Sequence, residues 1–279
     1  MVTTGGNRPP GEGLQMAYER VKVKRNPVLI ILPLISFLAF FGVWEFVVRT
    51  GIVPATMLAA PSTVVRLFVF KLTSANPDGA TLGAHAWMSM QEAVTAYVLA
   101  LIMGVPLGLA MGWFTVVRGM FRPVFELIRP IPPIAWIPLC IFWFGIGIWG
   151  KVYIIWIAGI VPFTINSWAG VKMTNPTFIQ MARTYGATDW QIFKQICIPS
   201  ALPMVFGALQ ISLAYCWTNL VGAELLAADR GLGYLIEMGR RLALPEMVVL
   251  GMVSVGIGGA LIGVIVDLLE RRLLAWIRR

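Results

Sequence analysis

Residues 93–117, AVTAYVLALIMGVPLGLAMGWFTVV, run for 25 positions without one charged side chain. A helix needs about 20 mostly apolar residues to cross the hydrocarbon core of a bilayer, because each residue advances it by about 1.5 Å. Strands of a membrane barrel are shorter, at about 10 residues, and alternate apolar with polar side chains. The stretch therefore predicts a membrane-spanning helix, which we expect to begin earlier, near His85.

Further stretches share this length and character, namely residues 26–44, 130–150, 152–171, 200–223 and 247–266. The composition agrees, since 58% of the 279 residues are hydrophobic and 13% are charged, whereas soluble domains carry about 25% charged residues. The first stretch is too long for a signal peptide and lacks a clear cleavage site, so we interpret it as a retained helix. The sequence thus predicts an all-α polytopic membrane protein with about six transmembrane helices.

The positive charge of the chain predicts its orientation. Six spans place both termini on one side, and that side carries 15 of the 22 Lys and Arg residues. By the positive-inside rule it is cytoplasmic. We expect a cytoplasmic tail over residues 1–25, a transmembrane domain over 26–270 and a basic cytoplasmic tail over 271–279. Orientation accounts for the net charge of +9, and no pattern of interleaved basic and aromatic residues predicts nucleic-acid binding.

Proline is dense in the third stretch, at Pro130, Pro132, Pro133 and Pro138. Each proline removes a backbone donor and clashes with the preceding turn, which predicts a broken or kinked helix. Non-helical backbone at membrane depth is tolerated where it is buried in protein or lines a cavity. Residues 126–147 are therefore the main candidate for lining a pathway, with a purely structural kink as the equal alternative.

Polar and bulky residues near the ends of spans complete the pathway hypothesis. Glu126 and Arg129 either pair with each other or act at an inner gate, and Glu224 either lines the outer pathway or caps a helix. Charges at membrane depth are costly and are usually functional or paired. The pathway candidates are Glu126, Arg129, Pro132, Pro133, Trp136, Asn219 and Glu224.

Glycines at four-residue spacing predict close helix contacts. Gly104, Gly108 and Gly112 share one face of the second span, and Gly259 and Gly263 share one face of the sixth. We expect these faces to pack within the chain rather than against another subunit. The three cysteines lie in or beside apolar segments without metal-ligand spacing, which predicts small core residues.

Other charged residues have simpler interpretations. Glu45 and Arg49, four residues apart, predict an ion pair at the membrane interface. Arg230, Arg240 and Arg241 lie in the last external loop, where they form a solvated face or attract an anion. The cores of the six predicted spans carry no charge, which argues against ion coupling as in a secondary carrier. His85 has no nucleophile or metal partner in the sequence, which argues against an enzyme.

Residues 172–199 are too polar to span and are predicted to be cytoplasmic. Asn175 is a good N-cap before Pro176, and Gly186 ends the first helix. Thr188 with Gln191 forms a capping box at the start of a second helix with an apolar surface. Such a hairpin either packs only on this chain or docks into a groove on a partner.

The segment QMARTYG at 180–186, followed by Ile196, Ile198 and Pro199, resembles the coupling loop of binding-protein-dependent ABC importer permeases. In that family the pattern is Glu-Ala-Ala, three residues, Gly, and then Ile and Leu-Pro after a fixed gap. The spacing from Gly186 to Pro199 matches it, while Gln180 and Met181 replace Glu-Ala. The resemblance implies ATPase-coupling roles for Gln180, Met181, Ala182, Arg183, Gly186, Asp189 and Pro199.

The resemblance extends over residues 58–272. Residues 129–136 (RPIPPIAW), 144–147 (FGIG), 222–226 (GAELL) and 230–233 (RGLG) resemble the taurine, alkanesulfonate and nitrate branch, and taurine permeases most of all. The fold implied is that of a type I importer permease in a bacterial inner membrane. The implied cargo is a small anion, with taurine or an alkanesulfonate first and nitrate, bicarbonate or an aromatic or pyrimidine-type solute as alternatives.

The resemblance also implies the working complex. Two ATP-binding subunits dock on the hairpins, a periplasmic or lipid-anchored binding protein delivers the substrate, and a second permease chain, as a homodimer, completes the pathway. ATP and Mg belong to the partner, because this chain has no GxxxxGK[ST] phosphate loop and no cofactor site. The hypotheses from other classes are a secondary carrier, although no internal repeat is visible, and a structural membrane subunit.

Overall fold

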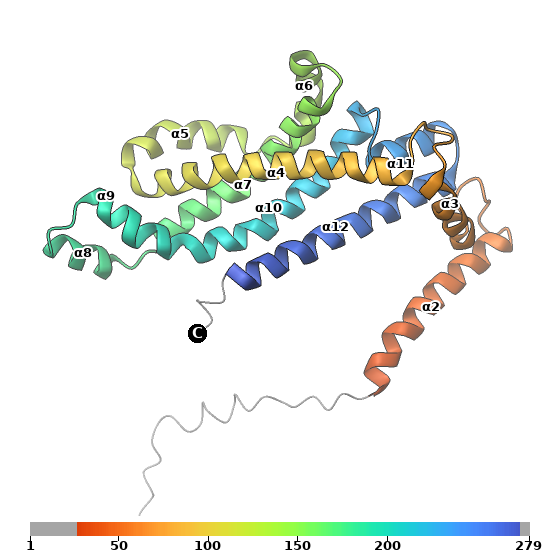
Figure 1. Ribbon diagram of the computed structural model, residues 1–279, viewed down its shortest axis with the longest axis horizontal. Coiled ribbons are helices and arrows are strands. Elements are labelled where there is room, and N and C mark those ends of the chain that lie inside the picture. The colour runs from red at the N-terminus through yellow and green to blue at the C-terminus, as the bar shows by residue number, and fades with distance from the viewer. Residues whose placement is uncertain (1–26, 274–279) are drawn as a thin grey trace, which may run out of the picture.

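The computed structural model describes residues 27–273, and over that part of the chain it is built of helices joined by turns (Figure 1). The longest helices of the bundle run beside one another along the long axis, and short helices lie at both ends and on one side. In chain order the helices are α2 (Pro27–Arg49), α3 (Pro61–Thr73), α4 (Leu82–Trp113), α5 (Thr115–Ile128), η2 (Pro133–Trp136), α6 (Ile137–Phe144), α7 (Ile148–Lys172), α8 (Pro176–Thr184), α9 (Asp189–Ile192), η3 (Phe193–Cys197), α10 (Ile198–Ala227), α11 (Leu232–Arg241) and α12 (Pro245–Leu273).

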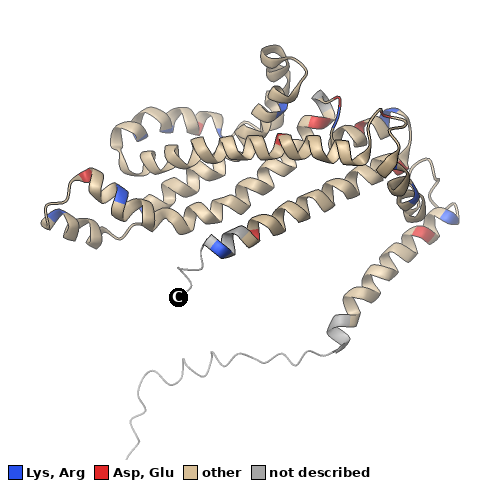
Figure 2. Cartoon of the chain, viewed as in Figure 1, with Lys and Arg blue, Asp and Glu red and all other residues tan. Residues whose placement is uncertain are grey.

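The prediction of about six spans is confirmed, with one of them broken. Five helical runs among the described residues are long and apolar enough to cross a membrane: Ile31–Arg49, Leu82–Trp113, Ile148–Lys172, Asp189–Leu225 and Pro245–Leu268. The pair Thr115–Ile128 and Pro133–Phe144 passes the same test together, bent by 89°. Figure 2 shows the charged residues gathered mainly at the ends of the bundle, with the middle of its long helices nearly free of them. The predicted tails at 1–25 and 274–279 lie outside the described residues.

The third span is broken, as its prolines predicted, but its bounds differ from the predicted residues 130–150. The helix begins at Thr115 and ends at Ile128, the chain turns over residues 129–132, and η2 and α6 continue in a new direction. Pro132 is extended, with ψ 134°, and Pro133 opens η2, because a proline without a backbone donor is tolerated in the first turn of a helix. Arg118, which lies between the predicted second and third spans, is therefore on α5.

The core is formed by α4, α7 and α10. The glycine face of α4 rests directly on α7: a Cβ added at Gly104 would lie 2.8 Å from the Phe163 Cβ, and one added at Gly108 would lie 2.3 Å from the Thr164 carbonyl oxygen. At Gly112 it would lie 2.6 Å from the Val171 Cβ. Such backbone proximity gives van der Waals contact where lipid supplies no hydrophobic drive. The prediction that this face packs within the chain is confirmed.

The other small-residue predictions have mixed outcomes. A Cβ added at Gly259 would lie 2.7 Å from the Trp217 Nε1, so this glycine also packs within the chain, whereas nothing lies within 4 Å of one added at Gly263. The three cysteines are free and buried, as expected.

Glu45 accepts from Arg49 at 2.5 Å, which confirms the predicted ion pair. Its second oxygen accepts from the Ser62 amide at 3.0 Å and so caps α3.

A buried ion pair that the sequence interpretation did not predict lies next to two of the uncharged stretches. Glu92 of α4 and Lys151 of α7 are both buried and form an ion pair. The uncharged stretches began at residues 93 and 152 and left both residues just outside, although the first of these two helices was expected to begin near His85 and so to include Glu92. The helices extend further, to Leu82 and Ile148. The pair satisfies two charges that neither helix could keep alone in a bilayer.

We expect Lys151→Met to destabilise the bundle by about 3–5 kcal/mol, because it leaves the Glu92 carboxylate buried without a partner. The double variant Glu92→Leu/Lys151→Met replaces the pair with apolar side chains and should regain most of that loss. Thermal unfolding of the detergent-purified chain measures both. A single variant as stable as the natural chain would contradict this account.

Candidate functional site

The hairpin predicted over residues 172–199 is present, and its local signals are confirmed. The Asn175 side chain accepts from the Thr177 amide at 2.9 Å and caps α8. Gly186 has φ +81°, a left-handed conformation that glycine adopts without steric cost. Its amide bonds the Arg183 carbonyl at 3.0 Å, and the Ala187 amide bonds the Ala182 carbonyl at 3.0 Å. These two bonds form a Schellman motif, which ends α8 at a fixed place.

The second arm of the hairpin starts from the predicted capping box. The Gln191 amide bonds the Thr188 hydroxyl at 3.4 Å, and the Thr188 amide bonds the Gln191 side chain at 2.8 Å. We predicted that this arm is a separate helix that ends before a span starting at residue 200, and that prediction is wrong. Through η3 it continues into α10 as one run, Asp189–Leu225. A movement of the hairpin is therefore a movement of α10.

One face of the hairpin packs on this chain. Ile192 and Phe193 are buried together with Leu109 of α4 and Val171 of α7. Ala182 packs against the same cluster, as does Ile179. The resemblance implied an ATPase-coupling role for Ala182, and that role stays a prediction. The side chain itself lies on the inner face of α8.

The other face of α8 is apolar and open. Phe178 is 56% exposed, Met181 52% and Tyr185 88%. Their spacing of three and then four residues places them on one side of the helix. Spacing at i, i+3 and i+7 is typical of a helix that docks into a hydrophobic groove.

The remaining coupling candidates surround this stripe. Gln180 and Pro199 are exposed. Arg183 and Asp189 form an exposed ion pair, Nη2 to Oδ1 3.1 Å, which joins the two arms of the hairpin. An exposed pair of this kind contributes about 0.2–1 kcal/mol. The caps rather than this pair therefore fix the shape of the hairpin.

The pathway candidates fall into two separate groups. Arg129 and Trp136 line one cavity of about 200 Å³ at the break between α5 and η2, and Pro132 and Pro133 form the break itself. Glu126 does not pair with Arg129; its Oε1 accepts from the Arg122 Nε at 2.7 Å. The pair forms because residues 122 and 126 are one helical turn apart, whereas the helix ends at residue 128.

The second group lies at the opposite end of α10. Glu224 is buried and accepts from the Ser89 hydroxyl at 2.5 Å and from the Gly233 amide at 2.7 Å. Ser89 in turn accepts from the Leu232 amide at 2.8 Å. Of the two roles weighed for Glu224, the geometry is that of a helix cap, here for α11. Asn219 donates to the Tyr215 carbonyl of its own helix, at 2.9 Å.

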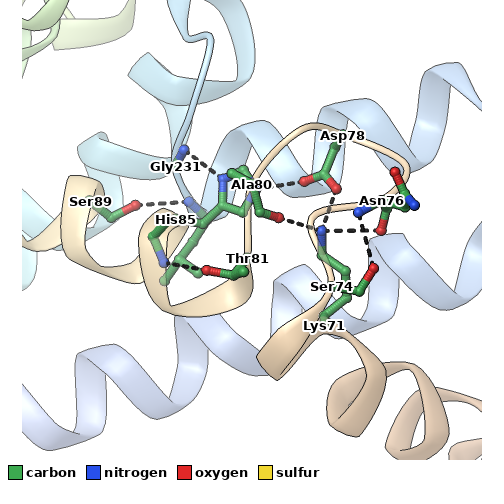
Figure 3. A network of polar contacts seen from close by, with 11 residues as sticks. Lys71, Ser74, Asn76, Asp78, Ala80, Thr81, His85, Ser89 and Gly231 are labelled. Carbon is green, nitrogen blue, oxygen red and sulfur yellow. Dashed lines mark hydrogen bonds and ion pairs between the residues drawn. The ribbon is translucent and has the colours of Figure 1, made fainter.

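A buried polar network beside this cap was not predicted (Figure 3). His85 Nδ1 accepts from the Gly231 amide at 3.1 Å, so Nε2 carries the proton and donates to Asp78 at 2.6 Å. The same carboxylate pairs with the buried Lys71, which also donates to the Ala80 carbonyl at 2.6 Å. The network ties α3, α4 and the loop before α11 together. No regular residue spacing predicted this network, because its members come from α3, the loop after α3, α4 and the loop before α11.

The arginines of the last loop are only partly free. Glu237 of α11 accepts from Arg240 at 2.6 Å and from Arg241 at 2.8 Å. These hydrogen bonds, from Arg240 first, lower the pKa of the Glu237 carboxyl to about 2. The arginine side chains themselves remain exposed, as the solvated-face interpretation predicted. Arg230 is exposed as well.

Ser89→Ala should loosen the start of α11, because the Leu232 amide loses its acceptor. Exchange of the backbone amides over residues 231–236 should become roughly tenfold faster, the upper end of what one hydrogen bond contributes. Hydrogen exchange followed by mass spectrometry measures it. Asn219→Ala, which removes a hydrogen bond within α10, is the control and should leave these amides unchanged. Equal exchange in both variants would contradict the cap.

Membrane-length helices with a capped hairpin at one end define a polytopic helical membrane protein. Comparison with known proteins then identifies the family. Residues 104–279 match the family described as binding-protein-dependent transport system inner membrane component, and the chain belongs to this family.

Relatives in the family share most of the chain. It is 35% identical to the taurine transport system permease protein TauC of Escherichia coli (strain K12), over 84% of this chain and 85% of that one. It is 28% identical to the putative aliphatic sulfonates transport permease protein SsuC of Bacillus subtilis (strain 168), over 84% and 83%. It is also 28% identical to the nitrate import permease protein NrtB of Synechococcus elongatus, over 82% of each chain.

The fold agrees with a solved transporter. A chain of the MetNI methionine ABC transporter, in an inward-facing conformation, matches with a TM-score of 0.53 at 19% identity. The match covers 66% of this chain and 95% of that one. The chain is thus an ABC importer permease of the taurine, sulfonate and nitrate branch, with the type I permease fold.

Proposed function

We propose that this permease takes up a small organic anion, taurine or another alkanesulfonate first, and that it is driven by ATP-binding subunits held on the α8–α9 hairpin. The observation that carries the proposal is the open apolar stripe of Phe178, Met181 and Tyr185 on a helix fixed at both ends. An apolar stripe facing water has a cost that a partner's groove removes.

Coupling follows from the continuity of the hairpin with a span. Because α9 runs through η3 into α10, a partner that binds α8 and shifts it also shifts α10. ATP and Mg bind to that partner, and this chain acts without catalysis. Gln180, Met181, Arg183, Gly186, Asp189 and Pro199 then form or shape the docking surface, with Ala182 supporting it from within.

The substrate proposal rests on relatives whose names span taurine, aliphatic sulfonates and nitrate. These solutes share a compact anionic group with several oxygen acceptors. Taurine comes first because the taurine relative has the highest identity of the three over a similar share of the chain. Nitrate, bicarbonate or an aromatic or pyrimidine-type solute remain the alternatives.

The working assembly in this proposal has two ATP-binding subunits, a periplasmic or lipid-anchored binding protein and a second copy of the permease in a bacterial inner membrane. Both termini face the cytoplasm, the side of the hairpin. The apolar surface of α6, with Phe142 at 87% exposure and Trp143 at 54%, needs lipid or the second copy to cover it. In Figure 1, α6 extends away from the bundle.

The test is uptake of labelled taurine by proteoliposomes that hold the chain with its ATP-binding subunit and binding protein. The double variant Met181→Glu/Tyr185→Glu should abolish both uptake and the ATP hydrolysis stimulated by loaded binding protein, because two charges cannot enter an apolar groove. The matched control is Gln180→Glu, which introduces the acidic residue that the family pattern has at this position of the same helix and should retain both activities.

Each other outcome has a defined meaning. If nitrate but not taurine is taken up, the coupling account stands and the substrate proposal fails. Uptake that needs no ATP would support a secondary carrier instead. Full uptake by the double variant would contradict docking through the stripe.

A further inference from the structure

Side chains from two other helices hold the start of α11. Its N-cap residue, Gly231, has no side chain that could cap the helix. The backbone amides of residues 231–233 donate instead to the His85 Nδ1, the Ser89 hydroxyl and the Glu224 carboxylate, at 3.1, 2.8 and 2.7 Å. The first amides of a helix have no partner within the helix itself. The position of α11 therefore depends on these contacts with α4 and α10.

The contact made by His85 differs from the other two because it needs a neutral ring. Figure 3 shows the imidazole between Gly231 and Asp78. Nδ1 accepts from the Gly231 amide while Nε2 donates to Asp78 at 2.6 Å, and only the neutral tautomer with its proton on Nε2 can do both. A protonated imidazole donates from both nitrogens. The Gly231 amide would then face another donor, and the hydrogen bond between them would be lost.

The backbone at Gly231 has little room in which to avoid this conflict. Its φ of +131° is one that side-chain-bearing residues rarely adopt, and a Cβ added there would lie 2.2 Å from the Glu224 Oε1. The loop before α11 thus lies tightly between α4 and α10. An amide that loses its acceptor on His85 cannot shift toward Glu224, so the loop has to move away from its present place.

The surroundings of the ring accept both of its states on the Nε2 side. The Asp78 carboxylate, which also pairs with Lys71 of α3, can meet a neutral ring as a hydrogen bond or a protonated ring as an ion pair. Tyr234 of α11 stacks on the imidazole, with ring centroids 6.1 Å apart. The other charged groups around the site are Glu224 of α10, Arg230 of the loop before α11, and Glu92 of α4 with its partner Lys151. Protonation therefore breaks one contact of the ring, the one to Gly231.

We propose that His85 is a proton-sensitive latch for α11, which holds the loop before α11 while the ring is neutral and releases it, slowing uptake, when acid outside the cell protonates the ring. The inference rests on the proposed function for its orientation, which places this end of the bundle outside, opposite the hairpin. Imidazole is the side chain whose charge ordinarily changes between about pH 5 and 8. Uptake depends on the latch because the loop and α11 present exposed arginines, Arg230, Arg240 and Arg241, to the side from which the binding protein arrives.

Two substitutions separate the roles of the two ring nitrogens. In His85→Asn the amide oxygen reaches about the place of Nδ1 and accepts from Gly231 at any pH. In His85→Gln the longer amide reaches about the place of Nε2, where it donates to Asp78 but leaves the Gly231 amide without an acceptor. The Asn variant should therefore behave as a latch that stays closed, and the Gln variant as one that stays released.

The measurement is taurine uptake by proteoliposomes that hold the complete complex, with the inside at about pH 7.5 and the outside at about pH 7.5 or 5.5, on either side of the ordinary range of imidazole. Uptake by the natural complex should fall roughly tenfold in acid, the effect of leaving one buried donor unpaired. The Asn variant should keep its uptake in acid, and the Gln variant should be roughly tenfold low at both values. One binding protein serves all three complexes, so any effect of acid on that partner is common to them.

The outcomes separate the latch from the function on which it rests. An equal fall in acid for the natural complex and the Asn variant would overturn the latch. Natural uptake by the Gln variant near pH 7.5 would overturn it too. If the natural complex takes up no taurine at either pH, the proposed function fails, and the state of the ring in the purified chain then decides the present inference.

His85 is the only histidine in the sequence, so isotope-labelled histidine gives a single imidazole signal in the NMR spectrum of the full chain, purified without a histidine tag. We expect a neutral ring with its proton on Nε2 near pH 7.5 and a protonated ring near pH 5.5. Amide exchange over residues 231–236, corrected for the intrinsic effect of pH, should become roughly tenfold faster over the same interval. A ring that stays neutral near pH 5.5, or that carries its proton on Nδ1 near pH 7.5, would overturn the latch.

Discussion

The backbone contact between α4 and α7 is the constraint on which the rest of the structure depends. A membrane offers helices no hydrophobic reason to associate, so close packing has to hold them. Gly104, Gly108 and Gly112 let the two backbones approach until no side-chain carbon would fit between them. α10 then closes on the same core, where the Ser212 hydroxyl donates to the Gly159 carbonyl at 2.8 Å. The hairpin and the α11 cap lie at the ends of this three-helix unit, and the broken span lies at its side.

The two ends of the unit are held by different physics. At the α11 end, buried polar contacts hold the helix in place. Glu224 and Ser89 cap α11, and His85 joins Gly231 to the Asp78 carboxylate. At the hairpin end, backbone caps and a small apolar cluster fix α8 on one side and leave its other side open. The first arrangement keeps a short helix in place, and the second presents a surface. Between them, at the broken span, Arg129 lines a cavity of about 200 Å³.

Sequence patterns predicted what depends on local backbone chemistry. The caps at Asn175, Gly186 and Thr188, the glycine face of α4 and the break among the prolines were all readable, because each follows from neighbours along the chain. Side-chain contacts between different helices and loops could not be predicted in this way. Nothing in the sequence joined Glu92 to Lys151, or His85 to Asp78. The motif marked the segment that contains Ala182, but not that this side chain lies on the inner face of α8. Glu126 paired within its own helix, since α5 proved helical where a loop was expected.

The central claim is that the outer face of α8 is where an ATP-binding subunit takes hold, and site-directed cross-linking tests it most directly. The three native cysteines are buried, so Tyr185→Cys provides a single accessible thiol on the hairpin. In a separate control variant, Ile52→Cys places the thiol just after the end of α2, where the natural side chain is 68% exposed. A short bifunctional reagent that links cysteine to lysine should join position 185 to the ATP-binding subunit and leave position 52 unlinked. A complex that hydrolyses ATP yet gives no link from position 185 would contradict the account.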